Sequence, residues 1–181
     1  MSNFVINPYL FAEDLDVCFT EGESYDLGIG FNSGGDYTRF GVGQRIKTGS
    51  DYIGKTLTTA SFYIRLVSGK TPSGTLTCTV IPTSGSGGSM SGTDIGTIDL
   101  TSLDETGAKI NFTGDNTREL EANDCIFCYM PSGTWGGYEI QFLHKATSYI
   151  ENQDIAYVQN LSGALDFSFS DGDCNWCFNV S

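Results

Sequence analysis

Two neighbouring segments of the chain show a period of two in their side chains. Residues 62–67 read FYIRLV and residues 75–80 read TLTCTV, and a short Gly/Ser/Pro connection joins them. Because successive side chains of a β-strand lie on opposite faces, the pattern predicts an antiparallel strand pair with one core face and one threonine-rich outer face. The residues predicted on the core face are Phe62, Ile64, Leu66, Leu76, Cys78 and Val80.

Similar short segments recur along most of the chain between glycine-rich turns, with 23 glycines and 4 prolines in 181 residues. No long window has the spacing of an amphipathic helix, and residues 117–124 hold one helical turn at most. The sequence predicts an all-β fold with little or no helix: an antiparallel two-sheet β-sandwich, jelly-roll-like, of about ten strands. The predicted strands are 39–48, 56–67, 75–81, 95–100, 108–113, 125–130, 138–145, 155–159, 165–170 and 175–180.

The chain divides into an extended acidic N-terminal arm, residues 1–36, and a single β-sandwich domain, residues 37–181. The arm contains several acidic residues and no lysine or arginine. Its apolar side chains need a surface to cover them, either on their own domain or on a neighbouring subunit. The predicted partner-binding residues are Phe4, Ile6, Tyr9, Leu10 and Phe11.

The charge is strongly acidic, with 22 Asp and Glu against 9 Lys and Arg and a net charge of −13. Such a surface repels nucleic-acid phosphates and anionic membranes, so neither is an expected partner. The opening residues lack the basic and apolar regions of a signal peptide, and no window has the apolar length of a membrane span. We therefore expect synthesis in the cytoplasm without the usual export signal.

Six cysteines include two CxxC pairs, 125–128 and 174–177. Four such thiols could bind zinc, but both pairs lie in strand-like segments, where residues i and i+3 lie on opposite faces. We therefore expect no metal and no cofactor. Cys78 and Cys128 share the periodicity of apolar neighbours and are predicted to be buried. Cys125 and Cys177 could form a cross-strand disulfide in an oxidising compartment, but without a signal peptide free thiols are favoured.

Catalytic patterns are missing from the sequence. The single histidine, His144, shares periodicity with Ile140 and Phe142, which favours packing over a role as a base. No nucleophile elbow or phosphate-binding glycine motif occurs, so a non-enzymatic protein is predicted. Asp171 and Asp173 are weak calcium candidates, because Asp and Gly also form ordinary turns.

Trp135 and Tyr138 both lie in the glycine-rich segment 131–138. An exposed aromatic ring beside polar neighbours can stack on a sugar, which makes this pair a candidate glycan site. Trp135 could instead fold over the end of a sheet and cap the core.

Three segments resemble a group of jelly-roll β-sandwich modules: residues 44–81, residues 120–130 (LEANDCIFCYM) and a closing strand at 166–169 or 176–180. Those modules resemble carbohydrate-binding modules and occur in secreted proteins and on phage particles. The opening FVINPYLFA, residues 4–12, resembles the start of many small phage and marine viral structural proteins. The motifs of this resemblance mark a fold and not a catalytic site.

The resemblance implies a virion structural protein, with a bacteriophage capsid decoration or cement protein as the leading hypothesis. It would bind the major capsid protein or sister subunits as a homo-oligomer, with a trimer favoured. The alternative is a carbohydrate-binding module or a host-recognition β-sandwich that binds a glycan.

Overall fold

The computed structural model describes residues 15–18, 24–31, 38–71, 73–82, 92–130, 137–145, 153–161, 164–170, 173–174 and 176–180. Within them the chain forms thirteen strands and one short 3-10 helix, η1 (Leu100–Ser102). The strands are β1 (Leu15–Cys18), β2 (Ser24–Phe31), β3 (Thr38–Ile46), β4 (Thr56–Leu66), β5 (Thr75–Pro82), β6 (Thr93–Asp99), β7 (Ala108–Glu119), β8 (Asp124–Tyr129), β9 (Gly137–Lys145), β10 (Gln153–Leu161), β11 (Ala164–Ser170), β12 (Asp173–Cys174) and β13 (Trp176–Val180).

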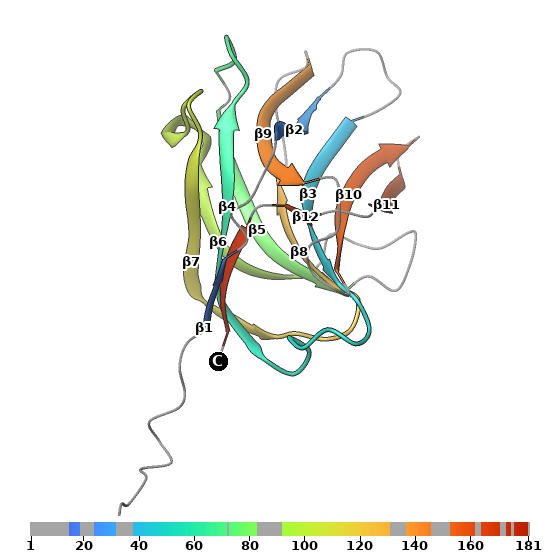
Figure 1. Ribbon diagram of the computed structural model, residues 1–181. Helices are drawn as coiled ribbons and strands as arrows, with labels where there is room; N and C mark the ends of the chain where they lie inside the picture. The colour runs from blue at the N-terminus through green and yellow to red at the C-terminus, as the bar shows by residue number, and fades with distance from the viewer. Residues whose placement is uncertain are drawn as a thin grey trace, which may run out of the picture.

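The strands form an antiparallel β-sandwich of two layers (Figure 1). The first layer has the order β11-β10-β3-β8-β5-β6. The second has the order β1-β13-β4-β9-β2, with β7 on the other edge of β4 and β12 beside β9. The layers are continuous through β2 and β3, where Gly30 pairs with Arg39.

Strand β4 is central to the second layer, because it is long enough to pair with three other strands. Its first half pairs with β13 and its second half with β9, while β7 runs along its opposite edge. On the side away from β2 and β3, a Cβ added to Gly96 of β6 would lie 2.7 Å from the Thr113 nitrogen of β7. Glycine at this position lets the backbones of the two layers approach closely.

Both layers contribute to one buried core, which confirms the predicted periodicity. Phe62, Ile64, Leu76, Cys78 and Val80 are buried in it, and Leu66 packs against it partly buried. The first layer adds residues from β3 and β8, and the second adds residues from β2, β7 and β9. Among these further core residues are Val42, Ile46, Ile126, Cys128, Ile29, Phe112, Ile140 and Phe142.

The threonine-rich face of β5 is not a solvent face. Thr75 is exposed, but Thr77 is 7% exposed and Thr79 is fully buried. Ile81, Cys125 and Phe127 are also buried, yet they lie outside the core between the layers. The outer side of the first layer is therefore covered over these residues.

All ten predicted strands overlap observed strands, and the all-β sandwich is confirmed. Strands β1, β2 and β12 were not predicted. Residues 15–18 and 24–31 were assigned to the extended arm, but they form β1 and β2, which are paired within the second layer. Residues 15–18 and 24–31 are therefore part of the sandwich, although they lie before the predicted arm–domain boundary at residue 36. Residues 117–124, where one helical turn at most was expected, form the end of β7 followed by a turn.

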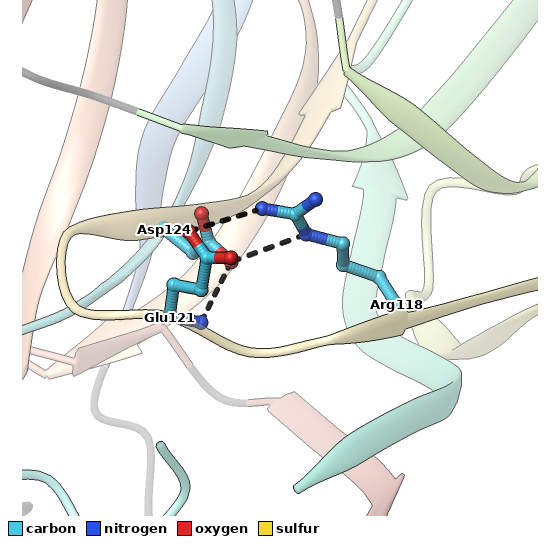
Figure 2. A network of polar contacts seen from close by, with 3 residues as sticks. All are labelled: Arg118, Glu121 and Asp124. Atoms are coloured by element: carbon cyan, nitrogen blue, oxygen red, sulfur yellow. Dashed lines mark hydrogen bonds and ion pairs between the residues drawn. The ribbon is translucent and has the colours of Figure 1, made fainter. Parts of the chain in front are cut away.

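That turn, between β7 and β8, is held by a buried carboxylate (Figure 2). The Asp124 Oδ2 accepts the Glu121 backbone N–H at 2.9 Å and lies 3.5 Å from the Arg118 Nε. Asn123 takes a positive φ of 71°, and its N–H donates to the Ile46 carbonyl of β3. The network therefore sets the point at which the chain enters β8, a central strand of the first layer.

We expect Asp124→Ala to lower the free energy of unfolding by about 2–3 kcal/mol, because it removes the buried carboxylate that accepts the partly buried Glu121 N–H and pairs with the Arg118 guanidinium. Urea denaturation measures this. Glu121→Gln is the matched control: its side chain is 70% exposed and 3.6 Å from Arg118, so a loss within about 0.5 kcal/mol is expected. Equal losses for the two variants would contradict a structural role for the buried carboxylate.

Candidate binding face

The outer side of the second layer carries a set of polar side chains from β4, β7 and β9. Because Phe62 and Ile64 lie in the core, the alternate residues of β4 lie on the opposite, outer face. Register places polar partners from the two neighbouring strands directly beside them. These pairs, which we call the polar face, are Ser61–Asn111, Tyr63–Lys109 and Arg65–Gln141.

Two hydrogen-bonded pairs fix the geometry of the polar face. The Ser61 hydroxyl donates to the Asn111 Oδ1 at 2.8 Å. Farther along β4, the Arg65 Nε and Nη2 both donate to the Gln141 Oε1, at 3.1 and 2.9 Å. Since each amide oxygen is engaged, the amide NH2 groups of Asn111 and Gln141 are the donors that these side chains can offer to a ligand.

Tyr63 lies between these two pairs on β4. It is half-buried, and its directly opposed neighbour Lys109 is exposed. An aromatic ring flanked by amide and cationic donors suits a ligand with an apolar ring face and many hydroxyl or carboxylate oxygens. Arg65 and Lys109 also give this face two of the nine basic residues of an acidic chain.

Acidic residues follow beyond the end of β4. The Leu66 N–H donates to the Asp104 carbonyl at 2.7 Å, which ties residues 104–107 to this strand end. Next to it, the Gly69 N–H donates to the Glu105 Oε1 at 3.0 Å. This hydrogen bond, together with one from Ser68, lowers the pKa of Glu105, so the carboxylate is ionised at neutral pH.

The outer side of the first layer has a different character. Burial raises the pKa of the Tyr129 phenol, and the nearby Asp94 charge raises it further. Tyr129 is opposed by Thr77 and Gly41, which are both buried. This side therefore offers less exposed polar surface over β3, β5 and β8 than the polar face does over β4 and β7.

The predicted site residues lie mostly outside the described part of the chain. This holds for the arm residues, for Trp135 and for Asp171. The backbone of Tyr138, in β9, pairs with Gly30 of β2, and that of Asp173, in β12, pairs with Lys145 of β9. The arm, glycan and calcium assignments at these positions therefore stay predictions.

The cysteine predictions are partly confirmed. Cys78 and Cys128 are buried in the core, whereas Cys125 is buried outside it, as expected for residues i and i+3 of a strand. The alternative Cys125–Cys177 disulfide is wrong. Cys125 is opposed by Arg45 and Ile81, and β8 and β13 do not pair. Within the described residues, no three His, Cys, Asp or Glu side chains gather closely enough to hold a metal ion.

In the part of the chain that the structure describes, no helix has the length and apolar character needed to cross a membrane. Comparison of the chain with protein-family models, with curated proteins and with solved structures finds no match. The likeness to carbohydrate-binding modules and to phage structural proteins therefore stays a prediction from sequence motifs.

Proposed function

We propose that this chain is a non-enzymatic structural protein of a virus particle, namely a bacteriophage capsid decoration protein. The observation that carries the proposal is the position of β1 at the end of the second layer. Strand β1 pairs with β13, and within the described residues no strand lies on its other edge. The largely apolar segment 4–11 precedes this edge strand in sequence, with residues 12–14 between them.

An edge strand offers a row of backbone donors and acceptors to a partner strand. A partner that pairs with β1 while covering the apolar side chains before it would gain both hydrogen bonds and buried apolar area. A sister subunit or the major capsid protein supplies such a surface where subunits meet on a shell. Clamping across these junctions, with a trimer favoured, would stabilise the shell without any chemical step.

The strong negative charge is compatible with this role. At −13, the protein repels other copies of itself in solution, which limits self-association away from the particle. Binding to the shell then depends on the apolar segment and the strand edge rather than on charge attraction.

Deleting residues 1–12 tests the proposal. We expect the full-length protein to co-sediment with particles of the virus that encodes it, and the truncated protein to lose this binding. Its melting temperature should stay within about 2 °C of the parent, because the deletion ends before β1. Tyr63→Ala on the polar face is the control and should bind particles normally. Particle decoration by the truncated protein would overturn the proposal.

A second candidate function is glycan binding, and the polar face favours it. Tyr63→Ala should then weaken retention on a polysaccharide column by about tenfold or more, as loss of a central aromatic contact does. Thr97→Ala, at an exposed position of β6, is the control and should leave retention unchanged. Trp135→Ala tests the loop site predicted from sequence. If every variant is retained like the parent, neither position binds the glycan.

A further inference from the structure

We propose that Cys18 and Cys177 form a disulfide that joins the first described strand of the chain to the last. Strands β1 and β13 are antiparallel, and Cys18 is the direct register partner of Cys177, with no irregularity along the pair. Directly opposed residues of antiparallel strands have Cα atoms about 4.5 or 5.5 Å apart. Disulfides span Cα separations of about 4.4–6.8 Å, so this register suits the bond.

Register also places this pair on the outer face of the second layer. Cys177 is opposed on its other side by Ser61, a residue of the polar face, whereas the next residue, Phe178, is opposed by the core residue Ala60. Directly opposed residues of paired strands share a face. By register, positions 18 and 177 therefore belong to the face of the second layer opposite the core, at the edge formed by β1.

A second cysteine pair in the same chain provides an internal comparison. Cys78 of β5 and Cys128 of β8 are also direct register partners. Neither takes part in a disulfide, and both are fully buried in the core. An oxidant reaches them only when the layers separate. We therefore expect Cys78 and Cys128 to stay reduced, although they are direct register partners.

The oxidation balances with a small-molecule disulfide as oxidant, for which we use oxidised glutathione. The thiolate of one cysteine attacks a glutathione sulfur and releases one glutathione thiolate, which leaves a mixed disulfide. The second protein thiolate attacks that mixed disulfide, forms the Cys18–Cys177 bond and releases the second glutathione. Two protein thiols are oxidised, and one oxidised glutathione is reduced to two thiols.

The bond would close a loop that contains most of the chain, because its ends are residues 18 and 177. Long loops give a disulfide its largest effect on the unfolded state. It would also fix β1 on the sheet, so that a pull on the preceding segment acts on the whole sandwich and not on a four-residue strand.

The test uses the folded full-length protein, first reduced and then incubated with oxidised glutathione. We expect the free thiols, counted after denaturation, to fall from six to four, and peptide mapping to find Cys18 linked to Cys177. The melting temperature should rise by about 5–10 °C relative to the reduced protein. Cys18→Ser and Cys177→Ser should each abolish this rise.

The double variant Cys78→Ser with Cys128→Ser is the matched control, and oxidation should still raise its melting temperature. Peptide mapping of the unmodified chain decides the question even if that variant does not fold. Six remaining thiols, a link between any other two cysteines, or glutathione left separately on Cys18 and Cys177 would each overturn the proposal.

Discussion

Replacing Gly43 with alanine is expected to lower the free energy of unfolding by about 3 kcal/mol or more, the upper range for overpacking a core. A Cβ at this position would lie 2.1 Å from the Ile126 carbonyl oxygen and 2.6 Å from the Phe127 Cα. These are backbone atoms of β8, which is paired directly with β3. Strand β10 pairs with the other edge of β3, so β3 cannot shift without breaking a ladder.

Gly69→Ala separates this steric effect from the general cost of adding a methyl group. Gly69 has a φ of 74°, and an added Cβ would meet nothing within 4 Å. Only left-handed backbone strain is expected there, about 1–2 kcal/mol. Guanidinium denaturation of both variants measures the difference. A loss at Gly43 no larger than that at Gly69 would mean that β3 and β8 are farther apart than described.

Phe62→Ala is the second large effect, with an expected loss of about 3–5 kcal/mol. The Phe62 ring is fully buried and makes edge-to-face contacts with Phe112 of β7 and Phe142 of β9, at centroid distances of 6.3 and 5.8 Å. Alanine would remove the central ring of this trio and leave a cavity among three strands of the second layer.

Two comparisons make the Phe62 result specific. Phe62→Leu keeps most of the apolar volume and should cost less than half as much as Phe62→Ala. Tyr63→Ala, one residue along β4 on the polar face, should cost about 1 kcal/mol, since Tyr63 lies outside the core. Thermal and urea unfolding should show the largest loss for Phe62→Ala and smaller losses for Phe62→Leu and Tyr63→Ala. A Tyr63 loss equal to that of Phe62 would contradict the assignment of the two faces.

The alternation in β4 and β5 was enough to predict their core residues, because a period of two is a local property of a strand. The burial of Thr77 and Thr79 was not predictable in the same way. It depends on what covers the first layer, and that is a property of the whole chain. Strand β2 was missed because its sequence, SYDLGIGF, contains two glycines and an aspartate, which weaken the strand signal.

Only part of the polar face could be predicted from the sequence. Tyr63 and Arg65 were predicted on the outer face of their strand, but their cross-strand partners could not be named. Register with β7 and β9 decides those partners, and no local pattern encodes it. The same limit explains the wrong Cys125–Cys177 pairing, because the strands that contain these residues lie in different layers.

Strand β1 pairs with the final strand so that Leu15 lies opposite Val180. During translation, residues 15–18 are therefore made before their partner strand β13, which follows more than a hundred and fifty residues later. An incomplete nascent chain has no place to hold β1. β1 is therefore paired only in molecules that contain β13, so products truncated before β13 would lack the edge strand that we propose binds the particle.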